Sequence, residues 1–420
     1  MARLTSWLRP GIKIKRWIVL GLLGVIATCI GLVRLMSSVL GLSAERLTWE
    51  QSLLAFGIGL VCIGAAVYGL LSTLLAPYHR LQTGTVADVL YTHSRKQRGM
   101  KVVAIGGGSG LPSVLRAMKP HTGNITAVVT VADDGGSSGR LRRDMGVPPP
   151  GDLRNNIAAL ADDESLMTRL FQYRFDNGDL KGHAFGNLFI AALTGISGSL
   201  ENALIETERV LNIQGRVLPS TLRDVQLVAD IQFPGMTEAT QVVGESTIGL
   251  SGGRIERVNL EPVNAEAYDE SVRAILEADI VIIGPGSLYT SILPNLLVKG
   301  IAEALRATPA YKIYVCNVAT QPGETEDFSV ADHVMALERH IGRGVFQTVL
   351  ANNAFPVENA GKNTIYVETV SPHHEIAQRY EVVYTDLTDQ QQPWRHDSVK
   401  LAELILTLRG NIVEKAAAAL

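Results

Sequence analysis

The chain has 420 residues, of which 46% are hydrophobic, and its formal net charge at pH 7 is -3. This length suggests more than one structural unit, and the lack of a basic excess argues against nucleic acid as a partner. The three cysteines, Cys29, Cys62 and Cys316, are far apart in sequence, which argues against a disulfide framework and against a cysteine zinc site.

Two long apolar segments lie near the N-terminus, at 17–36 and 52–77. Each is long enough to cross a hydrocarbon core of about 30 Å. A cleaved signal peptide is the alternative for the first segment, but a small-residue cleavage site is missing and a second apolar segment follows. A buried helix of a soluble domain is the alternative for the second. The sequence favours a transmembrane helical hairpin that anchors the chain through residues 1–80.

Positive charge sets the predicted orientation of this hairpin. Lys and Arg cluster before the first segment, at 3–16, and after the second, at 80–101, whereas the loop between the segments has only Arg46 beside Glu45 and Glu50. Positively charged flanks favour the cytoplasmic side of a membrane. We therefore expect both termini and the main domain to lie in the cytoplasm, with residues 81–100 as a juxtamembrane linker.

From residue 101 onward, short apolar runs alternate with helical patterns. Strands are expected at 101–105, 125–132, 279–283, 311–318 and 346–351, and helices at 111–118, 266–277, 288–307 and 330–341. The strand runs are continuously apolar, as in strands that are buried on both faces of a parallel sheet. Region 216–260 is rich in short strands and turns. The sequence therefore predicts a doubly wound, mostly parallel α/β domain at 101–420 with a small β insertion.

Glycines follow the first of these strands directly: Gly106, Gly107, Gly108 and Gly110, with Ser109 between them. Glycine lets a ligand approach the backbone closely, and the N-terminus of the next helix attracts anions. The run is neither a complete dinucleotide fingerprint nor a Walker A loop. A tight strand–helix turn is the alternative, but phosphate binding is the better explanation.

A second loop of this kind, GPGS, runs from Gly284 to Ser287, again between a strand and a helix. Ligands of open α/β sheets bind beyond the carboxyl ends of the strands, near the point where the strand order reverses. Two glycine loops at that point can form two walls of one anion site. The residues expected to hold the phosphates are Gly107, Gly108, Ser109, Gly110, Gly284, Gly286 and Ser287.

Acidic residues follow the strand predicted at 125–132. Asp133 and Asp134 could contact a ribose or a metal ion, or Asp134 could simply cap the turn. Asp152 could add a third carboxylate, or it could be the N-cap of the next helix. A hard cation such as Mg²⁺ prefers oxygen ligands. Asp133, Asp134 and Asp152 are therefore the candidate metal ligands.

Other polar residues of this region have two interpretations each. Arg140, Arg142 and Arg143 either clamp phosphates or form a solvated charge run. Asn187, near the start of a predicted helix, is expected to orient the ligand. His183 fits a hydrogen-bonded structural role better than a catalytic one.

The YvcK family of gluconeogenesis factors resembles this chain in four segments: GGGSGLPSVLRAMK, TVADDGGSSGRLRRDMGVPPPGDLRNNIAAL, HAFGNLFIAAL and GPGSLYTSILPNLLVKGI. That family is related to the CofD-type 2-phospho-L-lactate transferases. The resemblance extends over about residues 101–408. It leaves the apolar N-terminal segments outside.

The resemblance implies a Rossmann-like core that binds a nucleotide sugar, above all UDP-N-acetylglucosamine. It further implies a regulator of cell shape and of wall-precursor allocation during gluconeogenic growth, without established catalysis. Asp133, Asp134 and Asp152 match acidic positions of the transferases, so a Mg²⁺-dependent phospho-transferase is the alternative. The segments PPPGDLRNN and GPGSLYTS depart from the transferase pattern. A nicotinamide-dependent oxidoreductase is a third reading of the glycine loops.

These expectations together describe a multi-pass protein of the bacterial inner membrane. The membrane contacts are 17–36 and 52–77, and the ligand is a nucleotide sugar. A protein partner and homo-oligomerisation remain open.

Overall fold

The computed structural model describes residues 14–39, 49–79, 96, 98–161, 165–357 and 365–418. The chain divides into two compact units, Met1–Ser94 and Arg95–Leu420. Most of the predicted linker at 81–100, and the predicted boundary at residue 80, lie outside the described residues.

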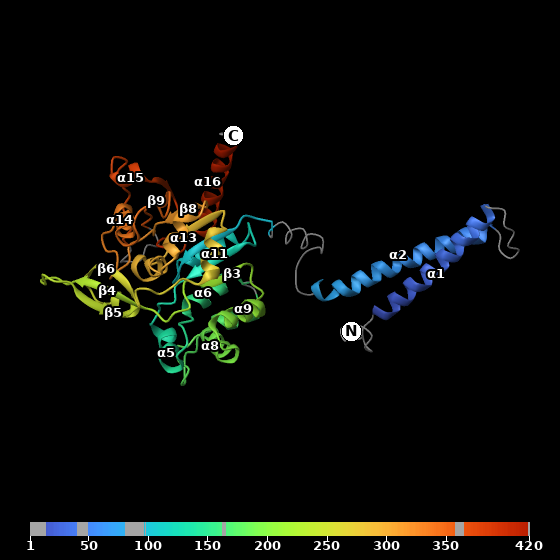
Figure 1. Ribbon diagram of the computed structural model, residues 1–420, viewed down its shortest axis with the longest axis horizontal. Helices are drawn as coiled ribbons and strands as arrows, with labels where there is room; N and C mark the ends of the chain where they lie inside the picture. Colours follow the sequence, from blue (N-terminus) through green and yellow to red (C-terminus); the bar gives the residue numbers. More distant parts are fainter. Residues whose placement is uncertain are drawn as a thin grey trace. The chain divides into compact units, whose positions relative to one another are not determined.

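The described part of the N-terminal unit is an antiparallel pair of helices, α1 (Ile14–Val39) and α2 (Trp49–His79) (Figure 1). Glycines allow the two backbones to approach each other. A Cβ atom at Gly24 would lie 3.0 Å from the Gly59 carbonyl oxygen, and one at Gly31 would lie 2.6 Å from the Phe56 nitrogen. Small residues at such positions are typical of helix pairs in membranes.

The lengths of α1 and α2 suit a membrane span. The apolar parts, Lys15–Met36 and Glu50–Ser72, have only 11% and 17% of their residues buried. A core helix of a soluble protein would be mostly buried. By length and composition, these two helices could span a membrane.

The C-terminal unit is built on a seven-stranded sheet in the order β10-β9-β8-β7-β1-β2-β3. The strands are β1 (Val102–Gly106), β2 (Ile125–Val129), β3 (Arg216–Pro219), β7 (Ile280–Ile283), β8 (Tyr311–Val315), β9 (Thr348–Asn352) and β10 (Glu381–Thr385). Each neighbouring pair is parallel. This confirms the predicted doubly wound α/β sheet.

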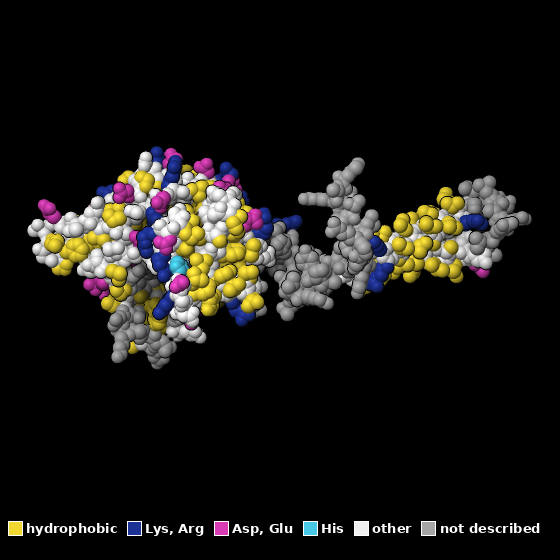
Figure 2. All heavy atoms as spheres, turned by 90° about the horizontal axis from the view of Figure 1, so that it is seen from below, with side chains coloured by type: hydrophobic (Ala, Val, Ile, Leu, Met, Phe, Trp, Pro, Cys, Tyr) yellow, Lys and Arg dark blue, Asp and Glu magenta, His cyan; other side chains and the backbone are white. Residues whose placement is uncertain are grey.

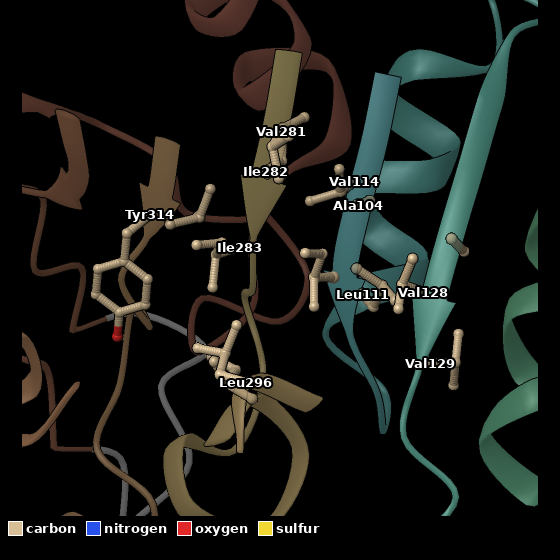
Figure 3. Close-up of a cluster of buried hydrophobic side chains, with 14 of the residues drawn as sticks. Ala104, Leu111, Val114, Val128, Val129, Val281, Ile282, Ile283, Leu296 and Tyr314 are labelled. Carbon is tan, nitrogen blue, oxygen red and sulfur yellow. The ribbon is translucent and has the colours of Figure 1, made fainter. Parts of the chain in front are cut away.

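The strand order reverses between β1 and β7. The chain builds β1, β2 and β3 toward one edge, returns to place β7 beside β1, and then continues through β8 to β10 toward the other edge. Figure 3 shows Ala104 of β1, Val128 of β2 and Ile282 of β7 in the core, with Leu111 and Val114 of α4 (Leu111–Met118). The two glycine loops therefore follow two adjacent strands at the switch point.

Helices occupy the connections between the strands (Figure 1). Between β2 and β3 lie α5 (Gly136–Met145), α6 (Gly151–Leu160), α7 (Leu166–Gln172), α8 (Phe185–Ser197) and α9 (Leu200–Leu211). The later helices are α11 (Asp269–Leu276), α14 (Val330–Ile341), α15 (Glu375–Arg379) and α16 (Ser398–Ala418). The helix predicted at 266–277 thus begins three residues later than expected.

Three predictions about elements were wrong in detail. The helix expected at 288–307 is divided into η2 (Leu288–Ile292), α12 (Leu293–Leu296) and α13 (Ile301–Ala307). Gly300, with a φ of 103°, breaks it, because a right-handed helix cannot pass through that conformation. The strands expected at 125–132 and 311–318 end at Val129 and Val315.

The β insertion is also smaller than predicted, because Arg216–Pro219 joins the main sheet as β3. The inserted antiparallel sheet has the order β5-β4-β6. Its parts are β4 (Gln226–Gln232), β5 (Thr240–Val243), the short α10 (Glu245–Ile248) and β6 (Arg254–Glu261).

Candidate functional site

The two glycine loops touch at the switch point. A Cβ atom at Gly110 would lie 2.5 Å from the Pro285 carbonyl oxygen, and one at Gly286 would lie 3.5 Å from the Gly107 carbonyl oxygen. The lack of side chains therefore lets the two backbones meet, as the sequence predicts. Asn317, which follows β8, fixes the second loop: its Nδ2 donates to Gly286 O over 2.9 Å, and its Oδ1 accepts from Gly286 N over 3.1 Å.

A cavity of about 780 Å³ opens beside these loops. The first loop contributes Ser109 and Gly110 to its lining, and the second contributes Gly286 and Ser287. The remaining lining residues are Ser113, Arg116, Pro285, Asn317, Val318, Ala319, Thr320, Gln321, Pro322, Asp389, Gln391, Gln392, Trp394, Arg395, His396 and Ser398. The cavity has the size of a small-molecule site and lies where open α/β sheets bind ligands.

The far wall of the cavity comes from the segment before α16, which the sequence analysis did not single out. Trp394 is 39% exposed and offers an aromatic face, and Arg395 is an exposed cation. His396 anchors the segment, because its Nε2 donates to Cys316 O over 3.0 Å. Burial lowers the pKa of His396 to about 4, so this histidine is neutral at physiological pH. No local motif marks this wall.

Gly107 and Gly108 do not line the cavity. Gly108 N donates to Oδ2 of Asp152 over 2.8 Å, and a Cβ atom at Gly107 would lie 2.5 Å from the same oxygen. Gly284 is also absent from the lining, and a Cβ atom there would lie 3.0 Å from Ile292. The structure therefore brings Ser109, Gly110, Gly286 and Ser287 to the cavity, but not the other three residues of that predicted set.

The predicted carboxylates have other partners. Asp133 Oδ1 accepts from Gly135 N over 2.8 Å, so Asp133 caps the turn, a role that the sequence offered as an alternative for Asp134. Asp134 Oδ1 accepts from Ser246 N at the start of α10. Asp152 is not the N-cap of α6, because Pro150 takes that position and the Asp152 side chain turns toward the glycine loop.

Three carboxyl groups of this region are buried, those of Asp152, Glu245 and Glu324. The sequence did not point to the last two. Burial, followed by the nearby Asp133, raises the pKa of Asp152 to about 7 and that of Glu245 to about 8. Burial also raises the pKa of Glu324 to about 7. Glu324 accepts from Thr290 Oγ1 over 2.8 Å and so supports η2.

Asp133, Asp134 and Asp152 are the predicted Mg²⁺ ligands. Within the described ranges, no three His, Cys, Asp or Glu side chains are placed to hold one metal ion. Asp133, Asp134 and Asp152 each accept a backbone N–H instead. The Mg²⁺ hypothesis stays a prediction.

The remaining predicted residues lie on α5, on α8 and in the segment just before α8. Arg142 forms a salt bridge with Asp224 over 2.5 Å, so its charge is paired with a carboxylate of the protein. Arg143 is exposed. His183 Nδ1 lies 3.1 Å from Ser137 Oγ, as expected of a hydrogen-bonded histidine. Asn187 Nδ2 donates to the same hydroxyl over 3.0 Å and does not line the cavity.

Comparisons with known proteins show which family this chain resembles. The CofD family (2-phospho-L-lactate transferase CofD) matches residues 102–408. A putative gluconeogenesis factor of Nostoc sp. is 42% identical over 96% of this chain and 92% of its own length. The gluconeogenesis factor of Bacillus subtilis is 46% identical over 73% of this chain and 98% of its own length.

A crystal structure of a UPF0052 family protein from Bacillus halodurans superposes on this chain with a TM-score of 0.69 and 41% identity. It covers 73% of this chain and 99% of that protein.

Proposed function

This chain belongs to the CofD family and, within it, to the gluconeogenesis factors, and from that premise we propose that it binds a nucleotide sugar of the UDP-N-acetylglucosamine type. The single observation that carries the proposal is the cavity of about 780 Å³ that reaches both glycine loops at the switch point. A diphosphate linked to a base and a sugar is the kind of ligand that needs phosphate donors at one end and flat or polar groups at the other.

The lining supports this division of roles. Ser109, Gly110, Gly286 and Ser287 line the part of the cavity where the diphosphate would bind. Arg116 on α4 and Arg395 on the opposite wall are the cations of that lining. Trp394 would stack on the uracil base, and the amides of Asn317, Gln391 and Gln392 would bind the base or the N-acetylated sugar.

The biological role that follows is regulation of cell morphogenesis and of wall-precursor allocation under gluconeogenic growth. The proposed role is binding without turnover, as in a ligand-sensing regulator. The N-terminal helices would hold this sensor at the inner membrane through 17–36 and 52–77, with the C-terminal unit in the cytoplasm. Fractionation of cells tests the anchor: the full chain should sediment with membranes, and a chain without residues 1–80 should not.

The alternative function is a Mg²⁺-dependent phospho-transferase, because the matched family is that of the 2-phospho-L-lactate transferases. Asp133, Asp134 and Asp152 would hold the metal ion in that case, and no catalytic step is assigned to them.

Calorimetric titration of the full chain in detergent tests the proposal, with UDP-N-acetylglucosamine, NAD and GDP, each with and without Mg²⁺. Chromatography of the same samples detects breakdown of the ligand. We expect the UDP-sugar to bind without Mg²⁺ and to remain intact. Turnover, or a preference for GDP with Mg²⁺, would transfer the protein to the transferase class, and a preference for NAD would assign it to the oxidoreductases.

Matched arginine variants locate the ligand. Arg395→Gln should weaken UDP-sugar binding about thirtyfold, because a hydrogen bond to a charged group is worth about 2 kcal/mol. Arg223→Gln removes an exposed arginine outside the lining and should leave the affinity unchanged. Equal effects of the two variants would place the ligand elsewhere.

A further inference from the structure

The N-terminal turns of three helices meet beside Asp152, which belongs to the first turn of α6. Asn187 in the first turn of α8 donates to Ser137 in the first turn of α5 over 3.0 Å. A Cβ atom at Gly151, the first residue of α6, would collide with Ser138 Oγ of α5. We call these three turns, together with the segment 173–184 that leads into α8, the helical corner.

None of these three helices has a side-chain N-cap. The N-cap residues are Gly135, Pro150 and Ala184, and none of them accepts a hydrogen bond from its helix through a side chain. By contrast, Ser165 and Ser199 cap the neighbouring α7 and α9. The Asp133 carboxylate lies at the start of α5, where Gly135 N donates to its Oδ1, and beside α6, where a Cβ atom at Gly151 would lie 2.9 Å from its Oδ2. Helix N-termini carry partial positive charge, so their convergence attracts anionic groups.

Three arginines surround the helical corner. Arg140 Nη2 donates to Lys181 O over 2.9 Å, and Arg174 Nη1 donates to Gly182 O over 2.6 Å, so both side chains meet one turn. Arg154 belongs to α6, and a Cβ atom at Gly186 of α8 would lie 2.9 Å from its Cδ. No described residue forms a salt bridge with any of these three arginines. Figure 2 looks from the side of α5 and α8 and shows a strip of Lys and Arg side chains there.

Arg154 carries the strongest sign of a ligand. It is only 9% exposed, and its Nη2 donates to Asn155 Oδ1 over 2.6 Å, while its Nε has no hydrogen-bond partner. Burial, followed by the nearby charge of Arg174, lowers the pKa of Arg154. Asp152 and Asp133 oppose this shift with smaller effects, and neither forms a salt bridge with Arg154. Burial of this cation is therefore costly, because the charge loses its hydration.

Buried polar atoms without a partner are frequent in the same three helices. Eight buried side-chain N or O atoms of the described residues have no hydrogen-bond partner, and five of them belong to α5, α6 and α8. These five are Arg140 Nε, Arg142 Nη1, Arg154 Nε, Asn156 Oδ1 and Asn187 Oδ1. Buried polar atoms in proteins are nearly always partnered, so such a concentration indicates a polar ligand.

We propose that the helical corner is a second anion site, separate from the cavity, and that it binds the phosphate group of a small phosphorylated molecule. A phosphate offers several acceptor oxygens at once, which suits three guanidinium groups and three helix N-termini. The carboxylates of Asp133 and Asp152 also act on Arg154 and would repel an anion, so the phosphate is placed toward Arg140 and Arg174. Asn187 Oδ1 would accept from a hydroxyl group of the ligand.

Calorimetry of the full chain in detergent tests this site with two probes, inorganic phosphate and glucose 6-phosphate, at constant ionic strength. Binding of at least one probe is expected, and the stronger probe tells whether the ligand is free phosphate or a monoester. Arg140→Gln and Arg174→Gln should each weaken it about tenfold or more, because each removes a charge-assisted donor. Arg169→Gln on α7, an exposed arginine outside the corner, is the matched control and should bind as the wild type does.

Two further titrations separate this site from the proposed nucleotide-sugar cavity. Phosphate should still bind in the presence of saturating UDP-N-acetylglucosamine, and it should bind Arg395→Gln as strongly as the wild type. Competition by the UDP-sugar, weaker phosphate binding by Arg395→Gln, indifference to Arg140→Gln and Arg174→Gln, or no binding of either probe would each overturn the second site. Failure of the UDP-sugar alone to bind would overturn the proposed function and leave the phosphate result standing.

Discussion

The cavity and the helical corner lie at the carboxyl ends of neighbouring strands of one sheet, but they present their polar groups in opposite ways. In the cavity, Arg116, Arg395 and Ser109 of the first glycine loop are exposed. In the helical corner, Arg154 and Asn187 are buried and incompletely partnered. An exposed cation contributes little to stability before a ligand binds. A buried cation without a salt bridge already destabilises the protein in the absence of ligand. The two regions should therefore respond differently to substitution.

The largest expected effect is on the cavity alone. Ser287→Trp places an indole where the second glycine loop lines the cavity, and Ser287 is only partly buried, so the fold should tolerate the change. Calorimetry should then detect no UDP-N-acetylglucosamine binding, while the thermal midpoint should stay near the wild-type value. Phosphate binding at the helical corner should be unaffected. If the UDP-sugar still bound this folded variant with wild-type affinity, the cavity assignment would be wrong.

The second prediction concerns Asp152, which contacts Gly108 between the two regions. Burial raises its pKa from 3.8 to about 7. The unfolded chain therefore loses this proton near pH 4 and the folded chain near pH 7, so the carboxyl group costs stability as the pH rises between these values. Asp152→Asn keeps an acceptor for Gly108 N and should be more stable than the wild type by about 4 kcal/mol at pH 8, since each pKa unit is worth about 1.4 kcal/mol.

The pH profile of thermal unfolding checks this prediction. The advantage of Asp152→Asn should shrink as the pH falls through 7 and should vanish near pH 4. Asp179→Asn changes an exposed carboxylate in segment 173–184 and should show no comparable pH dependence. An advantage of Asp152→Asn that stayed constant from pH 4 to pH 8 would exclude ionisation as its cause.

The sequence predicted the sheet well because strands buried on both faces must be apolar at every position. The runs at 101–105 and 279–283 became β1 and β7 with a shift of one residue at most. The helix expected at 288–307 failed because its apolar residues fit several short helical elements as well as one long helix. The break depends on the backbone at Gly300, and hydrophobic periodicity does not report it.

The site was predicted only in part, because its contacts join residues that are distant in sequence. Glycine loops after strands are a local signal, and Gly110 and Gly286 do meet at the cavity. Trp394 and Arg395 carry no local motif. The role of Asp134 depends on Ser246, which is 112 residues away. The arginines from 140 onward resemble a solvated run in the sequence, and only the packing of α6 against α8 shows that Arg154 beyond them is buried.

The smallest expected effect is also the sharpest contrast between the two regions. Arg154→Met replaces a buried cation by an apolar side chain of similar length. Because the desolvation cost of a buried charge beside Arg174 is removed, the variant without ligand should be more stable than the wild type by about 1 kcal/mol. Added phosphate should raise the thermal midpoint of the wild type but not that of the variant, because only the wild type retains the full site. Arg395→Gln should leave the midpoint unchanged without ligand, since that arginine is exposed. If Arg154→Met were instead strongly destabilised without phosphate, Arg154 would be a satisfied structural cation, and the contrast between an open cavity and a charged corner that needs its ligand would disappear.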